Sequence, residues 1–244
     1  MNPEREALYE IEVEVADLNA DNLLKPYGYQ KLFAQLAERH LNKYQMNTDD
    51  TMKMNLAWVL VALTFEIKRP VYGSMKLIGK TWYSLHQGPY FRRELEFKDE
   101  AGETVFCGST FSILFNFTNR SIYHKKELPF SIFDPIEEFT IEAKPTSRIS
   151  GEFSSVVQRQ AQNSQIDCLG HVNNCRYGEF AYDVFTPDEV QRLGELKRME
   201  FYFAHELRNK DLFTVYKAGD GNRLFVRGYN DTQDKKAFDV ILQF

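Results

Sequence analysis

The sequence predicts an α+β protein in which long helices pack against an antiparallel sheet. Three observations support this. Several segments alternate apolar and polar residues with a period of two, turn residues separate these segments, and only two segments carry a clear helical apolar stripe. A helix with one apolar stripe must bury that stripe, and here the sheet offers the apolar surface to do so.

The composition sets the class of protein. The 244 residues are 43% hydrophobic and 14% aromatic, enough for a substantial core in one large domain or two smaller ones. The net charge is −5 and the basic residues are scattered, which argues against a nucleic-acid partner. No apolar run approaches the roughly 20 residues of a membrane span, and the first residues are charged where a signal peptide would be apolar. Three cysteines make no disulfide framework, so we expect a cytoplasmic protein.

Strand patterns dominate the chain. In residues 111–117 the odd positions are apolar and alternate with smaller or polar residues, which predicts a strand with the odd face strongly buried. Residues 238–244 repeat this alternation. The turn residues at 100–102 and 219–222 predict hairpins. The apolar run at 54–67 predicts a strand entered through a short helical turn.

Two segments predict helices. After Pro26, the apolar stripe has the helical spacing 29, 33, 36 and 40, and it ends on a histidine. A second stripe occupies positions 177, 180, 181 and 184. Residues 133–150 contain two prolines and mixed charges, and we interpret them as a linker between two parts of the chain.

The segments that precede the two helices resemble each other. An offset of 150 residues aligns DLNADNLLKPYG, from Asp17, with DCLGHVNNCRYG, from Asp167. Both are followed by a succession of strands, so the match indicates a duplicated helix-and-sheet unit. The other aligned pairs are Ala20 with Gly170, Asp21 with His171, Tyr27 with Tyr177 and Gly28 with Gly178.

The second of these segments is unusually polar. Helix capping requires one Asp or Asn and a glycine turn, and leaves His171 and one asparagine without a role. Cys168, His171 and Cys175 could be read as zinc ligands, but the spacing is poor and a fourth ligand is missing, so we expect no metal. A thiolate nucleophile at Cys168 is also disfavoured, because nothing in the sequence indicates a lowered pKa.

A catalytic interpretation uses the whole group. The N-terminus of a helix presents free N–H groups that stabilise an oxyanion formed when a carbonyl is attacked. Asp167 can act as a base toward water or orient His171, and His171 can polarise the carbonyl or carry a proton. The asparagines can hold the substrate. This arrangement is suited to ester or thioester hydrolysis and needs no cofactor.

These residues carry a resemblance to the acyl-ACP thioesterase family, whose motif reads D-x-N-G/Q-H-V-N-N-x-x-Y. The positions that match it are Asp167, Gly170, His171, Val172, Asn173, Asn174 and Tyr177. In the first half, residues 55–83 resemble the family's W-V-L, strand and T-W pattern, and residues 91–120 resemble its R-R/D, strand and T-R pattern. The resemblance thus covers nearly the whole chain.

The resemblance implies two tandem hotdog domains, each a long central helix wrapped by an antiparallel sheet, at residues 1–142 and 143–244. It implies hydrolysis of fatty acyl-[acyl carrier protein] to free fatty acid and holo-ACP in fatty acid biosynthesis, without a cofactor. The acyl chain would occupy an apolar tunnel in the first half, and the chain would act as a monomer or homodimer. Gly170, Asn173 and Asn174 would bind substrate. Candidate basic residues for docking the acidic carrier are Arg92, Arg93, Arg159 and Arg176.

Two departures from the family pattern keep alternatives open. Family enzymes carry an asparagine two residues before the histidine, where this chain has Leu169. They also carry an acidic residue on a following strand, where this chain has His205, with Glu206 next to it; either would complete the catalytic group with Asp167 and His171. Glu206 would need a β-bulge to face the site. The alternatives are an acyl-CoA thioesterase of the same fold and a non-catalytic acyl-thioester-binding protein.

Overall fold

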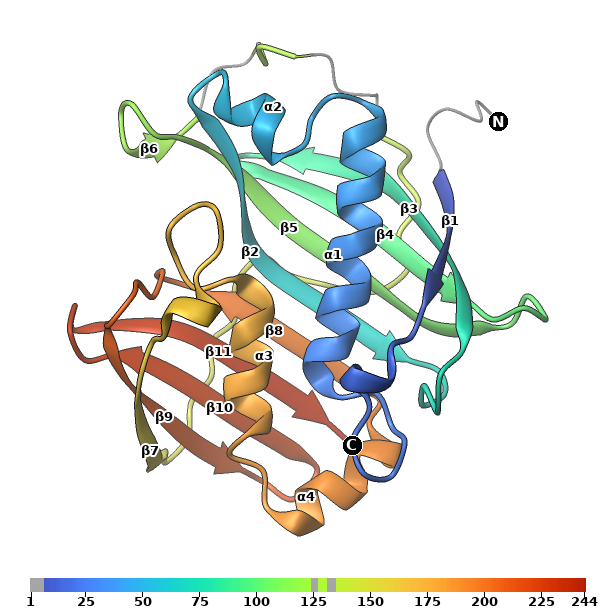
Figure 1. Ribbon diagram of the computed structural model, residues 1–244, viewed down its shortest axis with the longest axis vertical. Coiled ribbons are helices and arrows are strands. Elements are labelled where there is room, and N and C mark those ends of the chain that lie inside the picture. Colours follow the sequence, from blue (N-terminus) through green and yellow to red (C-terminus); the bar gives the residue numbers. More distant parts are fainter. Residues whose placement is uncertain (1–6, 124–126, 131–134) are drawn as a thin grey trace.

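The computed structural model describes residues 7–123, 127–130 and 135–244, and it places the long helices on one face of a single curved sheet (Figure 1). The sheet has eleven strands, and the pairings along it are antiparallel. The strands of the first half are β1 (Ala7–Glu12), β2 (Leu56–Ile67), β3 (Lys76–Gln87), β4 (Tyr90–Lys98), β5 (Thr104–Asn116) and β6 (Ser121–Ile122). Those of the second half are β7 (Ser154–Gln160), β8 (Arg198–Phe203), β9 (Leu212–Gly219), β10 (Arg223–Asn230) and β11 (Lys235–Gln243). The predicted α+β class is confirmed.

The strand order repeats itself. From one edge to the centre it is β1-β3-β4-β5-β2, and from the other edge to the centre it is β7-β9-β10-β11-β8. The two halves meet where β2 pairs with β8, and there the Phe65 and Phe201 rings lie 6.5 Å apart in the core. The two halves therefore share one continuous sheet and one hydrophobic core.

Each half also contains the same entry into its main helix, and the repeat runs at an offset of 148 residues. The isolated bridge between Leu18 and Leu24 corresponds to the bridge between Ile166 and Val172. The short 3₁₀ turns η1 (Val15–Asp17) and η2 (Asn163–Gln165) precede the two bridges. The alignment at an offset of 150 is therefore wrong by two positions: Asp167 corresponds to Asn19, since both side chains accept the N–H two residues later.

The helices lie on the concave side of the sheet. Helix α1 (Pro26–Lys43) begins with a proline at its first position and buries the predicted stripe, including His40. Helix α3 (Asn174–Tyr182) buries Tyr177, Phe180 and Ala181, but it ends before Val184, which the sequence placed on the helix. The remaining helices are α2 (Thr48–Met52), which precedes β2 as expected, α4 (Pro187–Gln191) and the 3₁₀ turn η3 (Arg192–Glu195).

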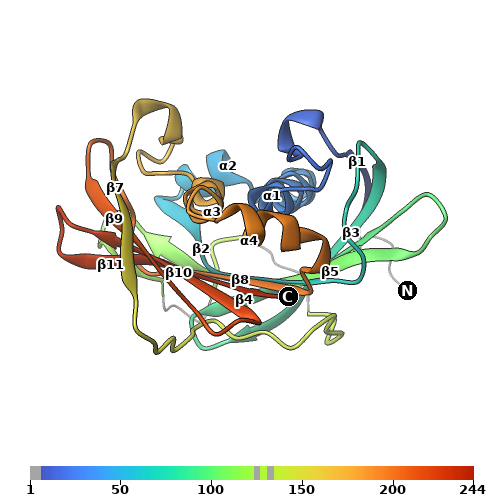
Figure 2. The same cartoon turned by 90° about the horizontal axis from the view of Figure 1, so that it is seen from below.

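Helices α1 and α3 lie side by side (Figure 2). A Cβ atom on Gly178 would lie 3.0 Å from Tyr27 Cβ, so the two helices approach closely at this glycine. Next to this contact, Gln30 Nε2 donates to the Asn174 carbonyl oxygen at 3.3 Å. The pair of helices thus brings the polar motif of the second half next to the helix of the first half.

The predicted hairpin turns at 100–102 and 219–222 join β4 to β5 and β9 to β10, as expected. The predicted burial of the odd positions over residues 111–117 is wrong for most of them: Ile113 and Phe115 on β5 are half-buried, and Phe117, which follows the strand, is exposed. Thr110 and Ser112 instead face the concave side with the helices, because they line a cavity there. Phe111 packs beneath the sheet with Ala62 and Tyr202.

The predicted linker has no regular structure over residues 135–150, while residues 133–134 lie outside the described residues. It crosses the convex face of the sheet, opposite the helices (Figure 2). Trp82 Nε1 donates to the Glu138 carbonyl, and Arg92 Nη2 donates to the Ile141 carbonyl. Arg92 is itself buried and bonded to Glu94, so the prediction that Arg92 serves as a surface docking residue is wrong.

Candidate active site

The polar motif forms a tight turn that leads into α3. The Asp167 N–H donates to the His171 carbonyl at 3.0 Å, and Gly170 takes a positive φ of +82°, which glycine adopts without strain. The Val172 N–H donates to the Leu207 carbonyl at 2.7 Å. The turn is therefore held both internally and by the segment that follows β8.

The carboxylate of Asp167 is the centre of the polar group. Its Oδ1 accepts the Leu169 N–H at 3.0 Å, and its Oδ2 accepts Asn173 Nδ2 at 3.3 Å. His171 Nδ1 lies 3.7 Å from Oδ1. Asp167 and His171 are both about one-fifth exposed, so each is held in place and yet reachable.

His171 has a defined tautomer. Its Nδ1 lies 3.3 Å from the Val172 carbonyl oxygen, which can only accept a hydrogen bond, so Nδ1 carries the proton. The neutral ring then presents Nε2 as an acceptor. Such a ring can take a proton from water and, once protonated, give one to a leaving thiolate.

Asn173 caps α3. Its Oδ1 accepts the Cys175 N–H at 3.0 Å while its Nδ2 bonds Asp167, so one side chain links the helix start to the carboxylate. The capping function that the sequence indicated is thus present, but it is combined with the contact to Asp167. The first turn of α3 supplies the positive end of the helix dipole at the same place.

His205 and Glu206 lie in the segment after β8. The Ala204 and His205 N–H groups both point to the Ala237 carbonyl, the two-against-one pattern of a β-bulge. Both His205 and Glu206 are exposed, and Glu206 pairs with Arg208. Within the described residues neither side chain is hydrogen-bonded to Asp167 or His171; the segment reaches the motif through the Leu207 backbone instead.

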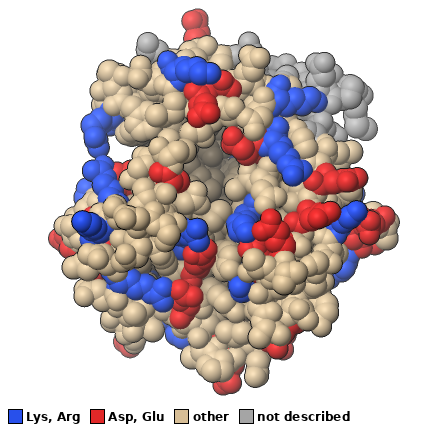
Figure 3. Space-filling model, viewed as in Figure 1, with Lys and Arg blue, Asp and Glu red and all other residues tan. Residues whose placement is uncertain are grey.

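A cavity of about 270 Å³ begins at the motif and extends into the first half of the chain. Asp167, Leu169 and Asn174 line it at the motif, whereas His171 is not among its lining residues. Further on, its walls come from α1, β2, β4 and β5, including Phe33, Ala37, Leu60, Leu63 and Phe91. The space-filling view shows the hollow on the helix-bearing face, with acidic and basic residues around it (Figure 3).

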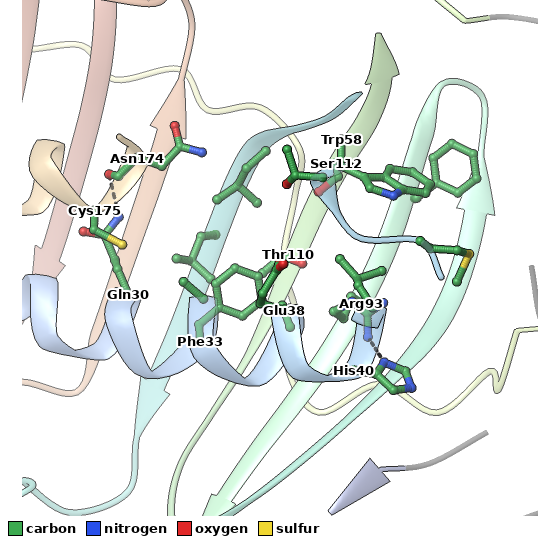
Figure 4. Close-up of a pocket in the computed structure, with 18 of the residues that line it drawn as sticks. Gln30, Phe33, Glu38, His40, Trp58, Arg93, Thr110, Ser112, Asn174 and Cys175 are labelled. Atoms are coloured by element: carbon green, nitrogen blue, oxygen red, sulfur yellow. Dashed lines mark hydrogen bonds between the residues drawn. The ribbon is translucent and has the colours of Figure 1, made fainter. Parts of the chain in front are cut away.

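Three polar residues line this cavity that the sequence did not assign to the site: Gln30, His40 and Arg93. Gln30 bonds Asn174 across the helices, as Figure 4 shows, and its Oε1 is buried with no partner among the described residues. The helical spacing of Gln30, Phe33, Ala34 and Ala37 was the available signal, since it places a polar residue and two small ones on one face. Arg93, expected at the docking surface, points inward.

The three cysteines have different environments. Cys168 is exposed, whereas Cys175 lines the cavity and burial raises the pKa of its thiol to about 12. Cys175 is therefore protonated at neutral pH and is a poor nucleophile. No group of three His, Cys, Asp or Glu side chains in the described part of the chain is arranged to hold a metal ion. No described helix is long and apolar enough to cross a membrane.

Solved structures of similar fold cover almost the whole chain. An acyl-ACP thioesterase from Bacteroides thetaiotaomicron VPI-5482 is 20% identical, with a TM-score of 0.87 and coverage of 98% of each chain. A putative oleoyl thioesterase from Lactobacillus plantarum is 14% identical, with a TM-score of 0.77 over 97% of this chain and 95% of that one. The 12:0-ACP thioesterase from Umbellularia californica is 12% identical, with a TM-score of 0.78 over 97% and 96%. At these identities the similarity establishes the fold.

The family itself is established by sequence. The profile of the acyl-ACP thioesterase N-terminal domain matches residues 5–127, the part of the chain that contains α1 and most of the cavity wall. A search of curated proteins finds no match. The resemblance first seen in the motif of the second half is thus confirmed independently in the first half: the chain belongs to the acyl-ACP thioesterase family of thiolester hydrolases.

Proposed function

We propose that this chain hydrolyses fatty acyl-[acyl carrier protein] at Asp167, releasing free fatty acid and holo-ACP in fatty acid biosynthesis. The observation that carries the proposal is the cavity, which begins at Asp167 beside the first turn of α3 and continues along α1 between apolar walls. A fatty acyl chain lying in it would bring its thioester carbonyl to the carboxylate.

The reaction requires a base, a stabilised oxyanion and a protonated leaving group. Asp167 takes a proton from water as the water oxygen bonds the thioester carbon, and the positive end of the α3 dipole stabilises the oxyanion. When the tetrahedral intermediate collapses, the C–S bond breaks and the carrier's thiolate takes the proton that Asp167 accepted from water, while His171, 3.7 Å from the carboxylate, orients it. Asn173 holds Asp167 in place, Gly170 shapes the turn, and Asn174 contacts the substrate.

The four catalytic candidates fall into two pairs: Asp167 and His171 lie together, whereas His205 and Glu206, the candidates for the family's acidic position, lie apart from them. His205 and Glu206 are exposed after the bulge, so either would have to turn toward His171 to take part. Leu169 lines the cavity and contributes only its backbone N–H to Asp167. We propose that Asp167 and His171 carry the reaction, and that the family's acidic position belongs to whichever of His205 and Glu206 moves inward when the carrier binds.

At the level of the whole chain, we propose two tandem hotdog domains, at residues 1–142 and 143–244. The repeated strand order supports this division, and the boundary falls in the linker. The first domain supplies the acyl cavity and the second supplies the motif.

We further propose a cytoplasmic enzyme that acts as a monomer or homodimer. It docks the carrier near Arg159 and Arg176, although each of these pairs with a carboxylate of its own chain.

Replacing the carboxylate tests the proposal. In Asp167→Asn, thiol release from acyl carrier protein thioesters should fall at least about 100-fold, because the amide cannot accept the proton from water. The measurement is a thiol assay at saturating substrate. Cys168→Ser, a change at the exposed neighbouring residue, is the matched control and should keep its activity.

The same assay separates the alternatives. An acyl-CoA thioesterase would release thiol faster from CoA than from carrier protein when the acyl chains are matched. A non-catalytic binding protein would bind acyl carrier protein tightly and release no thiol above background. Either result would contradict the proposed activity.

A further inference from the structure

The far end of the cavity, away from Asp167, contains a cation that makes no ion pair within the described part of the chain. Arg93 on β4 lines the cavity, and its Nη1 lies 2.5 Å from His40 Nδ1 and 3.3 Å from Thr81 Oγ1. No carboxylate of the described residues lies within ion-pair distance of Arg93. Burial lowers the pKa of Arg93 to about 10, so the group stays charged at neutral pH inside a largely apolar cavity.

His40, the hydrogen-bond partner of Arg93, is neutral and so does not balance the charge of the guanidinium. A guanidinium only donates, so His40 Nδ1 accepts its hydrogen bond. Burial and the charges of Arg93 and Lys43 lower the pKa of His40 to about 3, and the ring is neutral. The ring proton is therefore on Nε2, which is also buried and has no partner in the described ranges.

Trp58 on β2 supplies another unpaired donor at this end. Its Nε1 is buried and has no hydrogen-bond acceptor among the residues that the structure describes, while its ring packs edge-on against Phe91 with the centroids 5.0 Å apart. Trp58 and Arg93 line the same cavity at the end opposite Asn174 and Cys175 (Figure 4). A buried donor without an acceptor is costly, and its presence in a ligand cavity indicates that the ligand brings the acceptor.

We propose that the preferred acyl chain of this protein carries an oxygen, as a hydroxyl or a carboxylate, at the end distant from the thioester. The inference rests on the proposed hydrolase function and deepens it. Gln30, at the motif, and His40, at the far end, are ten residues apart on α1, a separation of about 15 Å. The oxygen therefore lies near the end of the chain, well away from the carbonyl that water attacks.

Three matched substrates test the preference. Acyl carrier proteins are loaded with chains of equal carbon number that end in a methyl group, a hydroxyl or a carboxylate, and kcat/KM is measured from thiol release. One of the two oxygenated chains should exceed the methyl-ended chain by about tenfold or more, because only the oxygen pairs the buried donors. Comparison of the hydroxyl-ended chain with the carboxylate-ended chain shows whether the site prefers a neutral or a charged acceptor.

Variants connect the preference to the named residues. Arg93→Met keeps the apolar length of the side chain and removes the donors, so it should abolish or reverse the preference. Trp58→Phe removes the Nε1–H while it retains an aromatic ring, and should weaken the preference even if Arg93→Met fails to fold. Lys98→Met, at a cation of the same strand that does not line the cavity, should leave the preference unchanged.

A binding measurement keeps this inference separate from the hydrolase proposal. The methyl ester of a fatty acid and those of its ω-hydroxy and ω-carboxy counterparts are titrated into the protein by calorimetry, which needs no turnover. Tighter binding of either oxygenated ester, lost in Arg93→Met, supports the inference even if no thioester is cleaved. Equal or weaker binding of both oxygenated esters, or equal kcat/KM for all three substrates, would overturn it and leave Arg93 as a steric end to the cavity.

Discussion

His40 occupies the last position of the apolar stripe on α1 and is buried as a neutral ring. Its environment explains the neutrality: Arg93 contacts Nδ1, Lys43 lies one turn further along the helix, and the Tyr44 ring packs edge-on against the imidazole. Protonation would place a third positive charge beside two others in a desolvated site. His40 therefore binds a proton less readily in the folded protein than in the unfolded chain.

This resistance makes the stability of the protein dependent on pH. The folded pKa of about 3 lies below the ordinary value of 6.5, so between these values the unfolded state binds more protons and the free energy of unfolding falls as the pH falls. From about pH 7 to pH 5 His40 should contribute a loss of about 2 kcal/mol. Urea unfolding at both pH values measures it, and His40→Gln should lose correspondingly less. Equal losses in the two proteins would contradict the assignment.

The neighbours Arg92 and Arg93 show the limit of sequence reasoning at the residue scale. Both were candidates for the carrier-docking surface, but Arg92 bonds Glu94 and the linker beneath the sheet, while Arg93 lines the cavity above it. Strand alternation predicts that the two point to opposite faces. It does not reveal that both faces are covered, because the linker and α1 come from distant parts of the chain.

At the scale of elements, the contact between α1 and α3 depends on Gly178. A Cβ atom there would lie 2.0 Å from Gln30 Oε1 and 3.0 Å from Tyr27 Cβ. The Gln30 side chain can move, but Tyr27 is fixed by its own helix. The close approach of the helices therefore requires a residue without a side chain at this position.

Gly178→Ala should consequently destabilise the protein by about 1–3 kcal/mol, the usual effect of overpacking. The sign is informative, since alanine in a helix is otherwise favoured over glycine by about 1 kcal/mol. Thermal or urea unfolding measures the change. Gly194→Ala, where the nearest side-chain atom would be 3.8 Å away, is the control and should be close to neutral. Stabilisation by Gly178→Ala would show that the helices can separate without loss.

Most elements could be predicted from the sequence, because apolar periodicity is a local property: α1, β2, β5 and both hairpin turns lie where expected. The repeat was recognised but misaligned by two residues. Identical letters at Tyr27 and Tyr177 favoured the offset of 150, whereas the backbone equates Tyr177 with Tyr29, which is likewise buried. The two halves share backbone hydrogen bonds and buried positions. Different residues can satisfy both, so the structural repeat shows few identical residues in the sequence.

The candidate site was predictable only in part, for a similar reason. Asp167, His171 and Asn173 are close enough in the sequence to form a recognisable motif, and they lie together in the structure. Gln30 and Arg93 belong to the same cavity but lie far away in the sequence, and only the packing of α1 against the sheet brings them to it. His205 and Glu206 depend on a local bulge that no periodicity indicates.

On the scale of the whole molecule, the pairing of β2 with β8 should make the two halves unfold together. Phe238, on β11 in the second half, is fully buried, and Phe238→Ala should cost about 3–5 kcal/mol. Both tryptophans, Trp58 and Trp82, lie in the first half. Their fluorescence in urea should nevertheless shift to a lower midpoint in this variant, together with the far-UV circular dichroism. An unchanged fluorescence midpoint would mean that the halves unfold separately.

The covalent union of the two halves also removes a restriction that symmetry imposes. In an assembly of identical subunits, every substitution appears in each subunit, so a residue cannot change its role in one subunit without the same change in the others. Here the position equivalent to Asp167 is Asn19, and each can vary alone. Under the proposed function, one half can therefore specialise in holding the acyl chain and the other in breaking its thioester bond.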